Sequence, residues 1–258
     1  MRIFDCCIIC DELDLLRIRL TELWDYVDVF VVVEADKTFD GTTKPFYAED
    51  LISGYSLYVG KQEIRYIKVT DMPEPAETTY RPDLHHGIKW NGQFHQRNAI
   101  MRGLYDLTDE DIIMISDVDE IWDPTVKKLS LPFAYEQLPM TGYLNIVQTD
   151  STWYGTMAIG RESLIENTPQ DLRMLKDGFP KVKGGWHFSW CGGEEAMLKK
   201  AKFTGHTKEE IIASGYDPDK ILDHISRMQG VKKIDIASLP KFIRKNTAYL
   251  KEKGFIYE

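Results

Sequence analysis

Three carboxylates follow a short apolar run and are the residues of this sequence best suited to chemistry. Residues 112–115 are all apolar, and Asp117, Asp119 and Glu120 lie within four positions just after them. Such a run is typical of a buried parallel strand, whose carboxyl end lies at the sheet edge where open α/β folds bind ligands. Because like charges this close repel one another, we expect a cation between them, and a divalent metal that carries a phosphate suits these ligands.

The pair Asp117 and Asp119 is compatible with four chemical roles. The acids could cap the following turn, although a cap needs only one acid. A phosphatase would use the first Asp as nucleophile with a hydroxyl residue soon after the second, where this chain has residues 120–122, Glu-Ile-Trp. A nucleotidyltransferase would add a Gly-rich phosphate loop before a helix, which the sequence lacks. A nucleotide-sugar transferase places such a pair after a buried strand, where Mn²⁺ or Mg²⁺ bridges the donor diphosphate.

Strand and helix patterns alternate before the acidic residues and would position them. Four apolar or β-branched runs predict strands, and two amphipathic patterns predict helices; one of these has leucines at three- and four-residue spacing from Leu13 to Leu23. This alternation predicts a mainly parallel sheet with crossover helices. The expected strands are 3–9, 27–33, 64–69 and 111–116, and the expected helices are 12–24 and 93–105.

The pattern changes after the acidic residues. Residues 143–150 and 152–159 alternate like antiparallel strands with a turn near Ser151, and 184–190 is a short strand rich in aromatic residues. The remaining segments are helical in pattern: 193–203, 208–213, 218–228 and 240–250. No repeat or linker divides the chain, so we predict one compact unit.

Composition bounds the class of protein. The chain has 258 residues, of which 43% are hydrophobic and 28% charged, as in soluble globular proteins. Its formal net charge of −9 argues against a nucleic-acid partner, because backbone binding needs clustered Lys and Arg. No apolar run approaches the roughly 18 residues of a membrane span. The N-terminal apolar run is interrupted by Asp5 and lacks a cleavage site, so it predicts a strand rather than a signal peptide.

The four cysteines do not form a metal-binding pattern. Cys6 and Cys7 lie on the first predicted strand, Cys10 directly follows it, and Cys191 is far away in the sequence. Because no second Cys-x-x-Cys pair completes a zinc site, we expect reduced, buried thiols in a reducing compartment, with the cytoplasm as location.

Five sequence blocks resemble glycosyltransferase family 17 and occur in that family's order. They are residues 10–20, 32–39, 95–100, 113–121 and 185–190. The resemblance implies an α/β GT-A fold, with a Rossmann-like, mainly parallel sheet flanked by helices, a smaller mixed or antiparallel sheet and a helical C-terminal tail. It also implies a UDP-sugar donor, a Mn²⁺ or Mg²⁺ ion and inversion at the anomeric carbon. Family members that act on Golgi glycoproteins carry a membrane anchor and stem, which this sequence does not show. We therefore expect a soluble bacterial or viral type of enzyme with another glycan acceptor.

Asp117, Asp119 and His187 are the predicted metal ligands. Asp119 is the main one, and Asp117 reaches the metal or the donor ribose. His187 follows Gly184 and Gly185, which permit close backbone approach; the alternative is a histidine packed in the core. The metal would act as a Lewis acid on the departing nucleotide diphosphate.

Arg97, Glu12 and Glu34 are the other predicted donor-binding residues. Arg97 presents a planar fork that matches a diphosphate, or it forms a salt bridge to one of the acids. Glu12 and Glu34 each follow a predicted strand and would surround the base and ribose. Glu12 could instead begin its helix, where a carboxylate is favoured.

Glu194 and Glu195 are the predicted catalytic bases. They follow Gly192 and Gly193 directly after the His187 strand, and an inverting transfer needs a base for the acceptor hydroxyl. They could instead only complement a helix N-terminus. Other base candidates are Glu120 and Asp150. Aromatic residues gather in the same half, where they form a sugar platform or core: Trp153, Tyr154, Trp186 and Trp190.

The sequence thus predicts a metal-dependent, inverting glycosyltransferase that moves a sugar to a carbohydrate hydroxyl, and the family resemblance implies N-acetylglucosamine from UDP as the donor. Residues 1–120 form the nucleotide-sugar half, 121–206 the acceptor and metal half, and 207–258 a helical tail. The alternatives are a metal-dependent phosphatase or nucleotidyltransferase, and a non-catalytic carbohydrate-binding protein.

Overall fold

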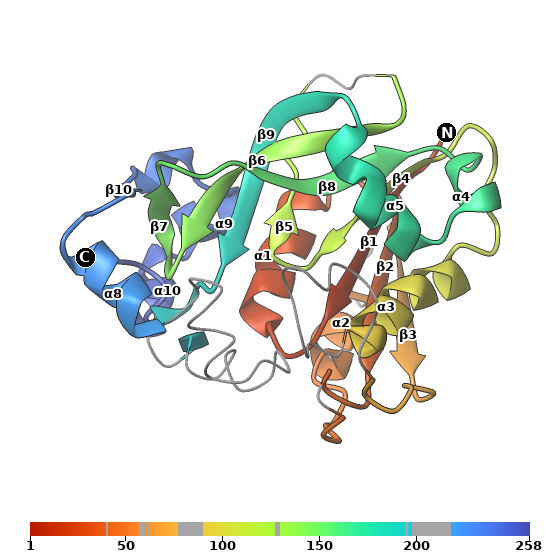
Figure 1. Cartoon of the computed structure of the whole chain (residues 1–258), viewed down its shortest axis with the longest axis horizontal. Helices are drawn as coiled ribbons and strands as arrows, with labels where there is room; N and C mark the ends of the chain where they lie inside the picture. The colour runs from red at the N-terminus through yellow and green to blue at the C-terminus, as the bar shows by residue number, and fades with distance from the viewer. Residues whose placement is uncertain are drawn as a thin grey trace.

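The computed structural model describes residues 1–39, 41–56, 60, 62–76, 90–126, 130–193, 196–197 and 218–258. Within them, ten strands form one mixed sheet with helices packed on it (Figure 1). The predicted α/β class is confirmed. The smaller sheet expected in the second half is continuous with the first.

The first four strands form the parallel part, in the order β3-β2-β1-β4. The expected strand positions are confirmed to within two residues. The crossover elements are α1 (Leu13–Leu23), α2 (Glu49–Ser56), and α3 (Asn91–Asn98), which continues as the 3₁₀ helix η1 (Ala99–Gly103). The strands are β1 (Ile3–Ile9), β2 (Val29–Ala35), β3 (Glu63–Val69) and β4 (Ile112–Asp117).

The strands of the second half are mostly antiparallel and extend the sheet beyond β4. The hairpin predicted between 143–150 and 152–159 is wrong, because β6 (Phe133–Thr141) pairs with both β7 (Tyr143–Gln148) and β8 (Trp153–Ile159). On its other side β6 pairs in parallel with β9 (Lys181–Ser189), which also pairs with the short β5 (Glu120–Ile121). Strand β8 joins this part to β4.

Two short helices and a 3₁₀ turn connect β8 to β9, and none of them was predicted. They are α4 (Ser163–Glu166), α5 (Pro169–Leu175) and η2 (Lys176–Gly178). The start of α5 is strongly specified: Thr168 and Asp171 form a capping box, and Pro169 is at the first helical position. As Figure 1 shows, α5 lies beside α3, so the two helices face one another across the end of β4.

The C-terminal segment is helical as expected, with one strand in addition. Its elements are α8 (Pro218–Ser226), β10 (Val231–Lys233), η3 (Ile236–Ser238), α9 (Lys241–Lys245) and α10 (Thr247–Glu252). The helix predicted over 240–250 is divided at Asn246, whose backbone leaves helical geometry. Strand β10 pairs with β7. The predicted helix 208–213 lies outside the described residues, and of 193–203 only Gly193, Ala196 and Met197 are described as helical.

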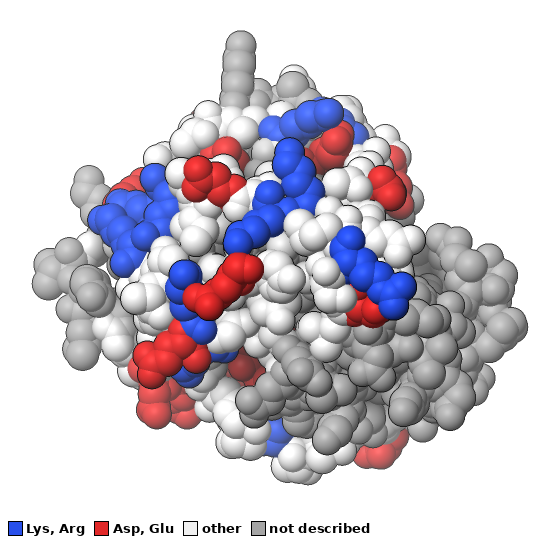
Figure 2. All heavy atoms as spheres, turned by 90° about the vertical axis from the view of Figure 1, so that its left-hand side faces the viewer, with Lys and Arg blue, Asp and Glu red and all other residues white. Residues whose placement is uncertain are grey.

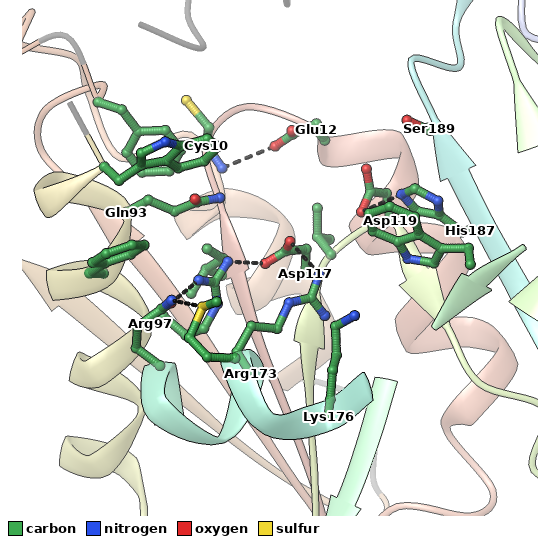
Figure 3. Close-up of a pocket in the computed structure, with 18 of the residues that line it drawn as sticks. Cys10, Glu12, Gln93, Arg97, Asp117, Asp119, Arg173, Lys176, His187 and Ser189 are labelled. Carbon is green, nitrogen blue, oxygen red and sulfur yellow. Dashed lines mark hydrogen bonds and ion pairs between the residues drawn. The ribbon is translucent and has the colours of Figure 1, made fainter. Parts of the chain in front are cut away.

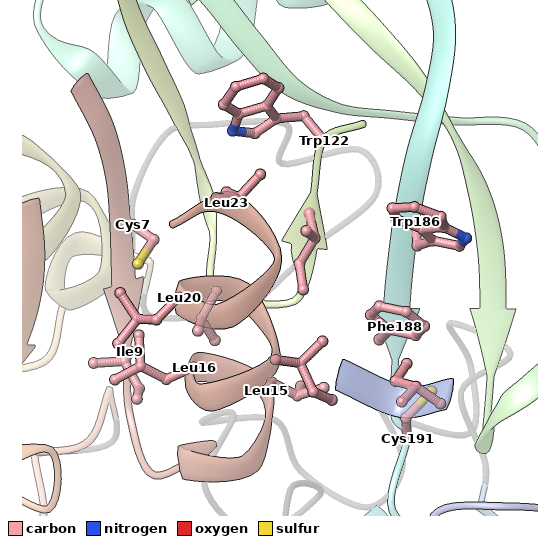
Figure 4. Close-up of a cluster of buried hydrophobic side chains, with 14 of the residues drawn as sticks. Cys7, Ile9, Leu15, Leu16, Leu20, Leu23, Trp122, Trp186, Phe188 and Cys191 are labelled. Carbon is pink, nitrogen blue, oxygen red and sulfur yellow. The ribbon is translucent and has the colours of Figure 1, made fainter. Parts of the chain in front are cut away.

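The larger hydrophobic cluster forms around α1. Three leucines of the predicted stripe, Leu16, Leu20 and Leu23, are fully inaccessible, and each contributes about 1.5–3 kcal/mol by burial; Leu13 is partly buried against the same cluster. Figure 4 shows α1 between β1 on one side and the Trp186 and Phe188 rings of β9 on the other. The α1 helix therefore ties the parallel part of the sheet to the second half.

The predicted buried thiols are confirmed for Cys6, Cys7 and Cys191, while Cys10 is partly buried; no cysteine is disulfide-bonded. Burial raises the pKa of the Cys7 and Cys10 thiols to about 12. Among the described helices, none has the length and apolar character needed to cross a membrane.

Candidate active site

A cavity of about 410 Å³ lies at the carboxyl ends of β1 and β4, where the sequence predicted a ligand site. The β1–α1 loop, α3, α5 and β9 form its walls (Figure 3). Its lining contains these charged or ionisable residues: Cys10, Asp11, Glu12, Arg97, Asp117, Asp119, Arg173, Lys176, Asp177 and His187.

Asp117, the last residue of β4, is paired with two arginines. Its carboxylate accepts hydrogen bonds from Arg97 Nη2 of α3 at 2.8 Å and from Arg173 Nη2 of α5 at 3.2 Å. The salt bridge considered for Arg97 is therefore present, and Arg97 also lines the cavity. A second nitrogen of Arg97 donates to the Gln170 side chain. Asp117 thus lies between α3 and α5 with its charge compensated.

Asp119 and His187 form the closest acid–histidine pair in the cavity. The distance from His187 Nε2 to Asp119 Oδ1 is 3.9 Å, and each side chain is about one-tenth exposed. The indole of Trp153 stacks on the imidazole with a centroid distance of 4.1 Å and an interplanar angle of 14°. Figure 3 shows the pair at the opposite end of the cavity from Cys10 and Gln93.

The β5–β9 pairing brings these two residues together. His187 is opposite Glu120 in the register, and the Phe188 N–H donates to the Asp119 carbonyl at 2.8 Å. Gly185 has a φ of +93°, and a Cβ there would lie 2.4 Å from the Ile121 carbonyl oxygen. The sequence-based argument that these glycines permit close backbone approach is thus confirmed for Gly185.

The Glu120 side chain does not face the cavity but forms hydrogen bonds with residues that line it. Both of its oxygens accept hydrogen bonds from Arg173 at 2.6 Å, and Trp153 Nε1 and the Asp117 N–H also donate to them. Burial opposes ionisation of Glu120, but the charge of Arg173 holds its pKa below the ordinary value. Sequence reasoning missed Arg173; the capping signature at Thr168 could have revealed its helix.

Glu12 and Glu34 have different environments. Glu12 lines the cavity, and its Oε2 accepts from the N–H groups of Cys10 and Asp11 at 3.0 and 3.2 Å, which orders the β1–α1 loop. Glu34 does not line the cavity. Its fully buried carboxylate accepts from Lys44 Nζ at 2.6 Å, from two backbone N–H groups of residues 47 and 48, and from the Tyr66 hydroxyl.

Some of the remaining predicted residues line the cavity, and others lie elsewhere. Trp153 and Trp190 line the cavity, whereas Trp186 packs in the main core. Asp150 lines a separate cavity of about 400 Å³ between β7 and α8. Glu194 and Glu195 lie outside the described residues.

Residues 1–234 match the model of Glycosyltransferase family 17. The chain belongs to this family.

The curated relatives of this family 17 chain are longer proteins. The human beta-1,4-mannosyl-glycoprotein 4-beta-N-acetylglucosaminyltransferase is 27% identical over 222 residues, which cover 73% of this chain and 40% of the relative. The rat protein of the same name is 28% identical with the same coverage. The chain therefore spans less than half the length of these relatives. Among solved structures, the mannosyltransferase PcManGT from Pyrobaculum calidifontis, in complex with GDP-Man and Mn²⁺, aligns with a TM-score of 0.42 and 11% identity. The alignment covers 98% of this chain and 81% of that one.

The possible metal ligands of the family 17 chain fit a metal ion that is bound partly by the protein and partly by a substrate. Over the described part of the chain, no group of three or more His, Cys, Asp or Glu residues is arranged to hold a metal alone. Asp119 and His187 offer one carboxylate and one imidazole nitrogen, which suit Mn²⁺. Metals of nucleotide enzymes commonly take one or two protein ligands and complete their shell with substrate phosphates and water.

Proposed function

We propose that this chain is a metal-dependent, inverting glycosyltransferase that moves N-acetylglucosamine from UDP to a carbohydrate hydroxyl. The observation that carries the proposal is the Asp119–His187 pair in a cavity at the carboxyl edge of the sheet, in a family 17 chain. The names of the human and rat relatives support N-acetylglucosamine as the sugar.

The donor diphosphate would lie at the centre of the cavity. Arg97 and Arg173 flank this region, and their planar guanidinium groups match phosphate oxygens. Asp119 and His187 would hold Mn²⁺ or Mg²⁺, which when bound stabilises the charge on the leaving diphosphate as a Lewis acid. Asp117 would fix both arginines and remain available to the metal or the ribose.

The two ends of the cavity suit the two substrates. At one end lie the aromatic residues Trp90 and Phe94, stacked at 6.5 Å, beside Gln93; a nucleobase would stack there. At the other end lie Trp153, whose indole stacks on the His187 imidazole, and Trp190; the parts of their rings that line the cavity would contact a sugar ring. The donor thus enters from the half formed by 1–120, and the acceptor from the half formed by 121–206.

The acceptor base is proposed to be Glu194 or Glu195. Both follow β9 closely in the sequence, and Ser189 and Trp190 at the end of that strand line the cavity. A carboxylate at this end would take the proton of the acceptor hydroxyl as it attacks the anomeric carbon and the UDP leaves.

Calorimetry with UDP-N-acetylglucosamine and Mn²⁺, followed by an assay for donor hydrolysis and transfer to a glycan array, tests the proposal. Asp119→Ala should lower turnover about 100-fold or more, because it removes charge stabilisation in the transition state, while its unfolding temperature stays near that of the parent. Asp123→Asn, four positions on and outside the cavity lining, is the matched control and should keep full activity. Hydrolysis of phosphomonoesters without binding of any UDP-sugar would refute the proposal.

A further inference from the structure

The guanidinium of Arg19 on α1 is fully buried beneath the acidic residues, and all five of its N–H groups are used. Nε and Nη2 donate to the Asp5 carboxylate, each at 2.7 Å, and Nη2 also donates to Ser116 Oγ at 2.6 Å. Nη1 donates to two backbone carbonyls, those of Asp117 at 3.1 Å and Glu120 at 2.9 Å. These carbonyls belong to the first and last residues of the acidic turn, 117–120.

Arg19 therefore spans the turn from which the proposed metal ligand Asp119 projects. Its contacts with the turn are to the backbone carbonyls at the two ends and leave the side chains of Asp117 and Asp119 to face the cavity. Asp5 is itself oriented by Trp122 Nε1, which donates to it at 2.9 Å. A buried ion pair is costly unless its hydrogen bonds are complete; here they are complete, so the network favours one geometry.

We propose that Arg19 is a positioning residue of the donor site, which fixes the acidic turn so that Asp117 and Asp119 are placed for the metal and the diphosphate. This inference rests on the proposed function. Residues that orient metal ligands from behind affect metal affinity strongly, since a small displacement of the ligand weakens the bond. Arg19 does not line the cavity, and it contacts Asp117 only at the backbone carbonyl, so its effect passes through the turn.

Arg65 on β3 provides a matched control. It is a second buried arginine whose five hydrogen bonds go to Glu63, Asp106 and the Gly103 carbonyl. It neither lines the cavity nor contacts the acidic turn. Arg65→Lys and Arg19→Lys each replace a five-donor fork by a single ammonium group. The carboxylate partner of Arg19 is fully buried and those of Arg65 are partly exposed, so the unfolding temperature is measured for both variants, and the comparison is made on the acidic turn and on binding.

Two measurements on the full chain separate positioning from stability. Hydrogen exchange reports the amides of Val118 and Phe188, which are bonded to the carbonyls of Ile8 and Asp119. Calorimetry reports the affinity for UDP in the presence of Mn²⁺. For Arg19→Lys we expect exchange at these amides to accelerate about tenfold and the affinity to fall about 10- to 100-fold. For Arg65→Lys we expect a lower unfolding temperature with both readouts within about twofold of the parent.

Equal behaviour of the two variants in both measurements would overturn the inference. If the parent binds no UDP with Mn²⁺, the proposed function fails, and the exchange data alone decide whether Arg19 holds the turn. If Arg19→Lys does not fold, Ser116→Ala removes one acceptor of the same fork. It should move exchange and affinity in the same direction by a smaller factor; unchanged values in this variant would refute the inference.

Discussion

At the scale of single residues, the acidic turn is stabilised by arginines as well as by any metal. The sequence shows three carboxylates in four positions, and the structure compensates them with Arg97 and Arg173. Arg173 donates hydrogen bonds to both carboxylate oxygens of Glu120, so this third acid is buried and stabilises the site without facing the cavity. The argument that close carboxylates need compensating positive charge thus holds, and in the structure this charge comes from two arginine side chains.

The sequence patterns predicted several of the residues that line the cavity. Asp117, Asp119 and Glu12 line the cavity, since residues at the ends of parallel strands meet at one edge. Arg97 of α3 and His187 of β9 line it as well. Glu34 also lies at the end of a parallel strand, but its side chain points away from the cavity. Successive side chains of a strand face opposite sides of the sheet. Arg19 and Arg173 could not be assigned from the sequence, since no spacing rule connects them to residues 117–120.

We expect Glu34→Gln to destabilise the fold without weakening the site. Glu34 and Lys44 form a buried pair, with side chains 0% and 5% exposed, and an unpaired buried ammonium costs about 3 kcal/mol or more. Urea unfolding should show this loss, while the UDP affinity of the folded fraction changes by less than about twofold. Glu12→Gln, in the cavity wall, is the comparison. A large loss of affinity in Glu34→Gln at unchanged stability would restore Glu34 as a donor-binding residue.

At the scale of elements, the close approach of β9 to β5 determines where His187 lies. The approach depends on Gly185, whose added Cβ would also lie 2.8 Å from Trp122 Cα. The same pairing includes the hydrogen bond that the Phe188 N–H donates to the Asp119 carbonyl. The geometry of the proposed metal pair is therefore a consequence of strand pairing.

Gly185→Ala should disrupt this pairing and the site together. We expect a loss of about 3 kcal/mol in unfolding free energy, because the methyl group overlaps backbone atoms that cannot move aside, and weaker Mn²⁺-dependent UDP binding. Chemical unfolding and calorimetry check both. Gly178→Ala is the control, since no atom lies within 4 Å of its Cβ position. A stable Gly185→Ala variant with normal binding would contradict the role given to this glycine.

The start of β4 is fixed by a second element-scale contact, at the opposite edge of the sheet. The Asp111 carboxylate accepts hydrogen bonds from Arg2 N at 2.7 Å, Arg2 Nη2 at 2.8 Å and the Thr108 N–H at 2.9 Å. Burial acts to raise its pKa, but these bonds lower it from 3.8 to about 2. Asp111 therefore stabilises the fold above about pH 4, and this contribution is lost as pH falls toward 2.

Asp111→Asn should lower the unfolding free energy by about 2 kcal/mol at neutral pH, since hydrogen bonds to a charged group are lost. The difference from the parent should shrink as pH falls from about 4 toward 2, where the parent carboxyl is also protonated. Urea unfolding over this pH range measures it. Asp109→Asn, whose side chain is 86% exposed, should show no such dependence, and a constant difference for Asp111→Asn would contradict the assignment.

The elements missed from the sequence are those that local patterns describe poorly. Strand β6 contains Pro139, which argues against an interior strand, and its residues are buried on both sides at its two ends, so that little alternation appears. Strand β10 has three residues, too few for a periodicity to appear. Strands β1, β2 and β4 were predictable because their long apolar runs are buried on both faces.

At the scale of the whole molecule, charge is mixed over the surface seen in Figure 2. On the described part of this face, Lys and Arg side chains lie among Asp and Glu with no broad area of one sign. The described part of this face therefore shows no basic surface of the kind that nucleic-acid backbone binding needs, in line with the net charge of −9.

The C-terminal segment is part of the main core. Leu239, Ile243, Leu250 and Ile256 are 0–5% exposed and belong to the cluster around α1, and α1 contacts α9 directly. The family match ends at residue 234, so these residues lie beyond it and still complete its core. We infer that the chain unfolds as one unit.

Ile243→Ala tests this inference. The residue is fully buried against the core cluster of α1, so its truncation should cost about 2 to 5 kcal/mol. If the tail and the sheet unfold together, tryptophan fluorescence and far-UV circular dichroism should shift by the same amount and remain coincident in urea. Ile165→Ala, at a position 74% exposed on α4, should change stability by less than about 0.5 kcal/mol. Separate transitions in the parent or in Ile243→Ala would instead show that the C-terminal segment folds apart from the sheet that bears the site.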